Sequence, residues 1–223
     1  MTHTVIDIET TGYLKYLDTF GRLDPSSQIL SVGYINIDSE SLNIIDAGVL
    51  YFYRPEFDVE AAQHVHHLTR EFLSKYEKDF DENIAKLEAL VTDRTLIGKN
   101  SNAFDLKFII GFLKTWGNFN EMAGPLPEST VDMQEIFSPL YRKLYYQKYN
   151  VQLSGRVKGK LEEYVRLLDP NGVALAAVLK DIKKYTEIND CNPHDALYDA
   201  AMTYLVYGAC VFRFRKEKSN GSV

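Results

Sequence analysis

The order of strand-like and helix-like segments is the feature that most constrains the fold of this chain of 223 residues. Three runs rich in Val, Ile and Tyr come first, at residues 4–8, 28–37 and 44–53, and each has the composition of a β-strand. Residues 38–43 form a short polar connection, so the second and third runs should pair antiparallel. Helical segments and short apolar pieces then alternate. This order predicts an α/β fold with a mixed five-stranded sheet, its first three strands antiparallel, flanked by helices.

The later elements follow from apolar periodicity and from the residues that begin and end helices. The expected helices cover residues 81–91, 104–116, 173–185 and 193–210, and the expected short strands cover residues 95–97 and 130–131. Residues 13–27 form a long connection, which we expect to be a mobile loop over a site at the end of the first strand. No linker or repeat marks a second domain. Residues 1–212 should therefore form one domain, followed by a polar tail at 213–223.

Composition narrows the class of protein. Hydrophobic residues make up 45% and charged residues 25% of the chain, which is ordinary globular usage and argues against disorder. The two cysteines, Cys191 and Cys210, cannot build a disulfide framework and fit a reducing compartment. The N-terminus lacks the pattern of a signal peptide, and the longest apolar run, residues 204–212, is too short to span a bilayer. We expect a soluble, cytoplasmic protein without a membrane partner.

The positive charge of the chain is concentrated in one segment. Residues 141–160 carry six cations and no acid, so the rest of an overall −6 chain carries −12. The cations are Arg142, Lys143, Lys148, Arg156, Lys158 and Lys160. Four tyrosines lie among them, and cations interleaved with aromatic rings suit a single-stranded nucleic acid. The alternative is a solvated amphipathic helix whose tyrosines pack inward.

Two acids in the first strand point to chemistry. Asp7 and Glu9 are two residues apart, so their side chains should share one face of the strand, while Ile6 and Ile8 occupy the other. Unpaired carboxylates inside an apolar strand are expensive, and no Lys or Arg precedes Lys15 in the sequence. A hard divalent cation with oxygen ligands is the natural partner. We expect the strand that carries both acids to be central in the sheet.

Three further residues in the second half of the chain are candidates for the same site. Asp105 lies near the start of an expected helix, where its alternative role is to complement the helix dipole. Asp199 lies inside the last helix, and His194 precedes it by five residues, about 1.4 turns, near the helix start. Asp195 competes with Asp199 as the functional acid, but it suits the exposed first turn of the helix.

A histidine cluster offers an alternative metal site. His64, His66 and His67 lie close together in the sequence, as zinc ligands often do. No cysteine is near them, and the acids form a better metal site. We therefore favour a structural role for these histidines.

Three segments, taken in order, resemble the exonuclease motifs of the DEDDh family, the DnaQ-like proofreading 3′–5′ exonucleases with an RNase H-like fold. They read V-I-D-I-E-T-T-G, N-A-F-D-L-K-F-I and H-D-A-L-Y-D, and the last matches H-x-A-x-x-D through His194 and Asp199. V-H-H-L-T at residues 65–69 is similar to the family's V-H-G-I-T, and T-V-D at 130–132 to its V-D-T. Asn100 and Ser101 stand where the family usually has His-Asn, and His67 replaces a glycine.

The resemblance implies stepwise hydrolysis of phosphodiester bonds from the 3′ end of single-stranded nucleic acid, with DNA favoured, to release nucleoside monophosphates. It implies two divalent cations, Mg²⁺ or Mn²⁺. Asp7 would bridge them, Glu9 and Asp199 would hold the cation that binds the attacking water, and Asp105 would act at the second. His194 would accept the proton of the water, because an ordinary imidazole pKa near 6.5 suits a base at neutral pH.

The same resemblance assigns the substrate contacts. The backbone groups of Thr10 and Thr11, together with Phe104, would hold the terminal nucleotide. Independently of the resemblance, the positive charge of residues 141–160 predicts that Lys158 and Lys160 contact phosphates of the strand. Three alternatives stay open: an exoribonuclease similar to oligoribonuclease or RNase T, a non-catalytic nucleic-acid-binding subunit with this fold, and a proofreading subunit that binds a polymerase in trans. The intact set of acids argues against the non-catalytic subunit.

Overall fold

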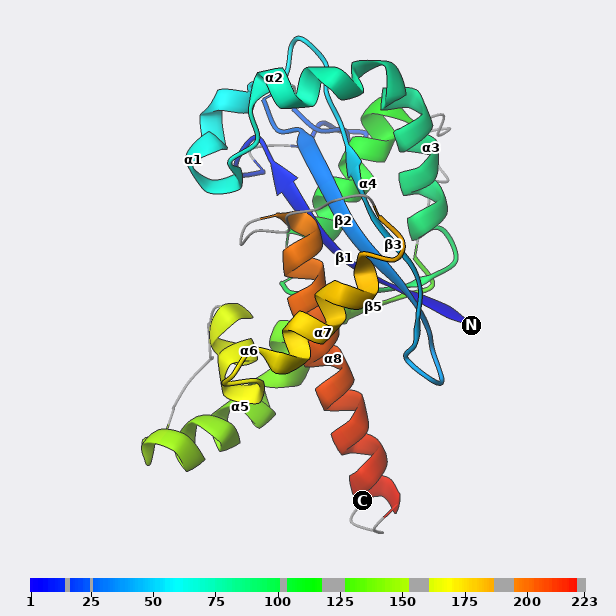
Figure 1. The fold of residues 1–223 in the computed structure, drawn as a ribbon. Coiled ribbons are helices and arrows are strands. Elements are labelled where there is room, and N and C mark those ends of the chain that lie inside the picture. Colours follow the sequence, from blue (N-terminus) through cyan, green and yellow to red (C-terminus); the bar gives the residue numbers. More distant parts are fainter. Residues whose placement is uncertain are drawn as a thin grey trace.

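The centre of the protein is a single mixed β-sheet (Figure 1). The computed structural model describes residues 1–14, 17–24, 26–100, 104–117, 127–152, 161–186 and 195–219. Within them the strands are β1 (Thr2–Thr10), β2 (Ile29–Asp38), β3 (Ile44–Tyr51), β4 (Thr95–Gly98) and β5 (Ser129–Asp132). They lie in the order β3-β2-β1-β4-β5, with β1, β2 and β3 antiparallel and β4 and β5 parallel to β1. This confirms the predicted sheet and the central position of the strand that carries the two acids.

Helices cover the sheet, and most of them lie where apolar periodicity places them. The longer helices are α3 (Phe80–Val91), α4 (Asp105–Trp116), α5 (Met133–Tyr149), α6 (Leu161–Leu168), α7 (Val173–Ile182) and α8 (Ala196–Ser219). Short helical turns connect β3 to α3, namely η1 (Val59–Ala62), α1 (Gln63–His66), α2 (Arg70–Leu73) and η2 (Ser74–Asp79). The sequence analysis predicts neither these turns nor α6. Helix α8 continues past residue 212, so residues 213–219 of the expected polar tail belong to it. Among the described residues, no helix is long and apolar enough to cross a membrane.

Two apolar cores lie on opposite faces of the sheet, and β1 contributes to both. Ile6 and Ile8 pack in the core that contains the apolar residues of α3 and α4. Val5 packs in the other core, with apolar residues of α5, α6 and α8. Because side chains alternate along a strand, Asp7 and Glu9 share the face of Val5 and therefore face α8.

Gly33 of β2 lets α8 approach the sheet closely. In the antiparallel register Gly33 lies opposite Asp7. A Cβ atom at this position would lie 2.2 Å from the backbone of both Ala196 and Leu197. The first turn of α8 therefore rests directly on the backbone of β2, beside the first acid of β1.

The long connection after β1 is attached to α4 in its described part. The backbone N–H of Leu23 donates to Thr115 Oγ1 at 2.9 Å, and Lys114 Nζ donates to the carbonyl of Phe20 at 3.3 Å. Leu17 also pairs with Leu23 through an isolated β-bridge. Residues 17–23 of the segment therefore pack beside α4, and the mobility expected of the loop stays a prediction.

Candidate active site

Three of the predicted acids meet at the end of β1. Oxygen atoms of Asp7, Glu9 and Asp199 all lie within 4.8 Å of one another. The first two come from one face of β1, and the third comes from α8, which packs on the same face. Residues separated by almost the whole chain thus converge on one point.

The start of α8 sets the position of Asp199. Asp195 Oδ1 accepts a hydrogen bond from the N–H of Leu197 at 3.0 Å, which satisfies a donor that the helix start leaves free. The N–H of Asp199 donates to the carbonyl of Asp195 at 3.0 Å, so Asp199 lies one turn further along. The structure therefore makes Asp195 the half-buried cap of α8 rather than the exposed first-turn residue expected from the sequence, and leaves Asp199 to face the acids of β1.

Asp105 approaches the cluster from the other side of the sheet. It is the first residue of α4, it is only 5% exposed, and its Oδ2 atom has no hydrogen-bond partner among the described residues. Burial, followed by the charge of Asp132, raises the pKa of Asp105 to about 7, while Lys99 opposes this rise. Asp105 is not one of the three acids whose oxygen atoms lie closest to one another. Its charge nevertheless raises the pKa of both Asp7 and Glu9.

The electrostatics of the cluster favour a bound cation. Burial raises the pKa of Asp7 well above its usual range, and the charges of Asp199 and Asp105 raise it further. Burial and then Asp199 raise the pKa of Glu9 to about 8. Carboxylates that lie close together in a buried site repel one another, and this raises the free energy of their charged forms. A divalent cation bound by them removes this repulsion. The all-oxygen donor set, with the unsatisfied Asp105 oxygen beside it, fits a hard divalent cation.

Sequence reasoning missed two residues that support the cluster. The charge of Lys99 lowers the pKa of Asp7 and of Asp105, so this side chain partly offsets their repulsion. Asp132 Oδ1 accepts hydrogen bonds from Gln134 N–H and Asn100 N–H, both at 2.9 Å. The first bond caps the start of α5, and the second holds the backbone of Asn100 just after β4. Strands β1, β4 and β5 are parallel, so their carboxyl ends meet at the same edge of the sheet. Lys99 follows β4 and Asp132 ends β5, so this arrangement could have predicted that both residues lie near Asp7.

A cavity of about 320 Å³ lies beside the acids, on the side of Glu9. Thr10 and Phe104, two residues expected to hold the terminal nucleotide, line it together with Tyr13 and one wall from residues 61–66. Thr11 is not among the lining residues. Its N–H donates to the Gln28 carbonyl and its hydroxyl to the Ser26 carbonyl, both at 2.9 Å. Thr11 therefore supports the chain behind the cavity, and its contact with substrate stays a prediction.

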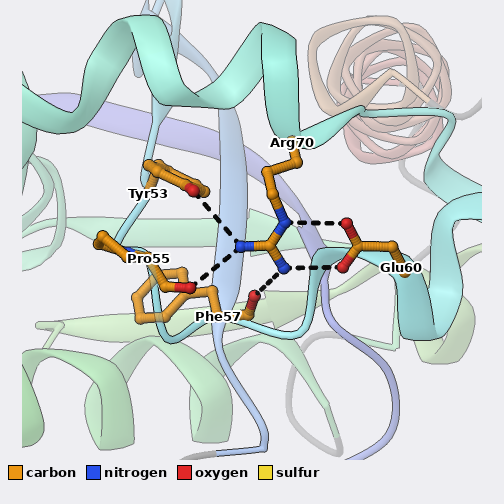
Figure 2. A network of polar contacts seen from close by, with 5 residues as sticks. All are labelled: Tyr53, Pro55, Phe57, Glu60 and Arg70. Atoms are coloured by element: carbon orange, nitrogen blue, oxygen red, sulfur yellow. Dashed lines mark hydrogen bonds and ion pairs between the residues drawn. The ribbon is translucent and has the colours of Figure 1, made fainter.

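Arg70 ties together the segment that carries the cavity wall (Figure 2). Its guanidinium binds both carboxylate oxygens of Glu60, at 2.9 and 2.7 Å. The remaining three hydrogen bonds reach Tyr53 Oη at 3.3 Å, the Pro55 carbonyl at 3.0 Å and the Phe57 carbonyl at 2.9 Å. All five guanidinium donors are thus used. Hydrogen bonding to Arg70 lowers the pKa of Glu60 to about 2.

The histidines near the cavity have structural roles. His66 is buried, and its Nδ1 accepts a hydrogen bond from the N–H of Leu68 at 3.0 Å. His67 ends α1 with φ of 57°, the left-handed conformation that the glycine of the V-H-G-I-T pattern adopts readily. In the described part of the chain, the acids are the only group of three potential metal ligands, so these histidines do not form a zinc cluster.

Three predicted site residues, His194, Lys158 and Lys160, lie outside the described residues.

Comparison with known proteins identifies the family. Residues 4–207 match the RNase_T family, described as exonuclease. No curated protein matches the sequence significantly. Among solved structures, E. coli exonuclease I in complex with a dT13 oligonucleotide has a TM-score of 0.58 at 18% identity, and the match covers 99% of this chain and 43% of that one. The zinc-bound form of the exonuclease I–ssDNA complex has a TM-score of 0.56 at 17% identity, covering 96% and 40%. The chain thus spans about two fifths of the proteins it resembles, and these likenesses show the fold. It belongs to the exonuclease family of nucleases and has the RNase H-like α/β fold.

Proposed function

We propose that this protein is a metal-dependent 3′–5′ exonuclease that hydrolyses single-stranded nucleic acid, with DNA favoured, and releases nucleoside monophosphates. One observation carries the proposal: in a chain of the exonuclease family, oxygens of Asp7, Glu9 and Asp199 lie within 4.8 Å of one another. Exonuclease I, which has the same fold, has been solved with a dT13 oligonucleotide, and this supports a DNA strand as substrate.

The acids would hold two divalent cations, Mg²⁺ or Mn²⁺. Asp7 would contribute to both, Glu9 and Asp199 to the first, and Asp105 to the second. When bound, such a pair stabilises charge on the attacking and leaving oxygens of the phosphodiester. The unsatisfied Oδ2 atom of Asp105 supports its place in this set.

His194 is the proposed base. It precedes the capping residue Asp195 and lies five residues before Asp199 in the sequence. A neutral imidazole would take the proton of the attacking water as its oxygen bonds to phosphorus and the bond to the 3′ oxygen of the preceding nucleotide breaks. The leaving 3′ oxygen takes the second proton of the water from the new phosphate group and becomes the hydroxyl of the shortened strand, and the imidazolium releases the first proton to solvent.

The cavity beside Glu9 would bind the nucleotide at the 3′ end. Its volume lies at the lower end of the range for small-molecule sites. Phe104 offers a ring for stacking and Thr10 a polar wall, while Arg70 holds the opposite wall in place through Glu60. Lys158 and Lys160 would contact phosphates further along the strand.

The test uses one sequence prepared as DNA and as RNA, labelled at either end, with Mg²⁺ or with EDTA. We expect a ladder of shortened products from the 5′-labelled strand and immediate release of a labelled mononucleotide from the 3′-labelled strand. EDTA and the Glu9→Gln variant should abolish both. Glu77→Gln makes the same change at an exposed position of η2 and should be fully active. Internal cleavage, or cleavage in EDTA, would contradict the proposal, and faster loss of RNA would move the assignment to an exoribonuclease.

A further inference from the structure

A second cavity lies on α5, away from the acids. Its volume is about 380 Å³, and among the described residues Arg142, Lys143, Tyr146 and Gln152 line it. The lining thus combines two cations, an amide and a phenol, and it includes no carboxylate from the described residues. A pocket of this kind attracts a phosphate and can hydrogen-bond or stack on a base.

The tyrosines of α5 divide between the core and the solvent. Tyr141 is 5% exposed and packs against Tyr164 of α6, which agrees with the inward packing considered from the sequence. Tyr146 and Tyr149 are 52% and 51% exposed, and Lys148 Nζ lies 5.3 Å from the centre of the Tyr149 ring. The end of α5 therefore presents rings and cations together on its surface. Exposed rings favour the unstacked bases of a single strand over a duplex.

Helix α5 runs from a point near the acids to this cavity, so its length indicates how far apart the two sites lie. It begins at the end of β5, and Asp132 at that point binds the backbone of Asn100 just after β4. With a rise of about 1.5 Å per residue, Tyr146 lies roughly 20 Å from the start of the helix. Figure 1 shows α5 extending away from the sheet. A strand whose 3′ end lies at the acids would need several nucleotides to reach the cavity.

We propose that the cavity lined by Arg142, Lys143 and Tyr146 is a second binding site for the same single strand, upstream of its 3′ end. This inference rests on the proposed exonuclease function for the placement of the 3′ end. It predicts that the cavity contributes more to the binding of long strands, which span both sites, than to the binding of short ones.

Binding is measured without hydrolysis, in EDTA, by fluorescence anisotropy with single-stranded DNA of about 20 nucleotides, a length well above the site size of a typical single-strand module. The variant R142Q/K143Q removes two cations, and the matched control K78Q/K180Q removes two exposed lysines elsewhere. Each phosphate contact on a single strand contributes about 0.7 to the slope of log K against log salt concentration, so the slope should fall by about 1.4. At 0.1 M salt, this fall in the slope corresponds to binding of the strand that is weaker by roughly tenfold or more.

The variant Tyr146→Leu separates stacking from charge. It should weaken binding of the long strand about fivefold while the salt slope stays at the wild-type value, because a ring contributes no counterion release. A strand of about three nucleotides, measured by competition, cannot span from the acids to Tyr146 and occupies one site at a time, so these substitutions should weaken its binding less than that of the long strand.

Each outcome decides the question. A lower slope and a larger loss of binding for the long strand than for the short one, with the control unchanged, supports the second site. Unchanged binding of R142Q/K143Q, an equal loss in K78Q/K180Q, or an equal loss with the short strand overturns it. Because the assay contains no metal and no cleavage step, it remains decisive if the wild-type protein proves inactive in the end-label experiment, which would refute the proposed function separately.

Discussion

Replacing Gly33 by alanine tests how the fold brings Asp199 to the acids of β1. The added Cβ would lie 2.2 Å from the backbone carbon of Ala196 and from the backbone nitrogen of Leu197. Ordinary contact begins near 3.4 Å, so the start of α8 must move outward by about 1.2 Å. The obstructing atoms belong to the helix backbone, so no side-chain rotation relieves the clash.

This displacement should damage the metal site more than the fold. Metal ligands tolerate only about 0.2 Å of error in their distances, and a misplacement of about 1 Å in a catalytic group commonly costs about 100-fold in rate. Forcing extra atoms into a packed interface costs about 1–3 kcal/mol of unfolding free energy. We therefore expect a folded Gly33→Ala protein with a modestly lower Tm and kcat/KM reduced about 100-fold.

The assay compares the rise in Tm on addition of Mn²⁺ or Mg²⁺ with the rate of strand digestion. Gly208→Ala is the matched control, because it lies in the same helix and its added Cβ would meet nothing within 4 Å. That variant should keep the metal response and the activity, and alanine should stabilise the helix by up to about 1 kcal/mol. A Gly33→Ala protein with wild-type metal response and activity would refute the idea that the close approach of α8 positions Asp199.

Three further predictions concern the base, the acids and the cavity wall. His194→Ala should lower kcat about 10²–10⁴-fold and leave the metal-induced rise in Tm unchanged, whereas a purely capping histidine would lower stability with normal kcat per folded molecule. Without metal, the protein should lose stability between about pH 5 and 8, because the raised pKa values of Glu9 and Asp105, about 8 and about 7, favour folding only while these carboxyls are protonated. Urea unfolding in EDTA across this range checks the sign, and stability that rises with pH would contradict it. Arg70→Lys should raise KM several-fold at constant kcat, since one ammonium cannot replace a five-donor fork, and an equal fall in kcat would place Arg70 closer to the chemistry.

The acids of β1 and the order of the sheet were predictable because both depend on local periodicity. Alternation along one strand put Asp7 and Glu9 on one face, and the structure places Ile6 and Ile8 in the opposite core. The meander of three strands needed only one short polar connection to indicate its pairing. Asp199 was found through its motif, since spacing along a helix does not reveal which strand the helix will cross.

The supports of the site could not be predicted, because they depend on contacts between distant segments. Gly33 reads as an ordinary strand residue until α8 is placed on it. The turns between residues 59 and 79 are too short for helical periodicity, so neither the cavity wall nor the role of Arg70 in holding it was visible. The attachment of residues 17–23 to α4 likewise rests on bonds such as that from Leu23 to Thr115.

The acids come from elements that pack on opposite faces of the sheet, and this arrangement links the site to the stability of the whole domain. Asp199 belongs to α8, whose core contains Val5, whereas Asp105 begins α4, whose core contains Ile6. Among the described elements, β1 is the one that contributes side chains to both cores and also carries acids of the cluster. Without a cation, the repulsion that raises the pKa of Asp7 acts across the sheet and favours separation of the two helices. The two cations, one held by Asp199 and the other by Asp105 with Asp7 contributing to both, would turn this repulsion into attraction, so their binding free energy would stabilise both cores together.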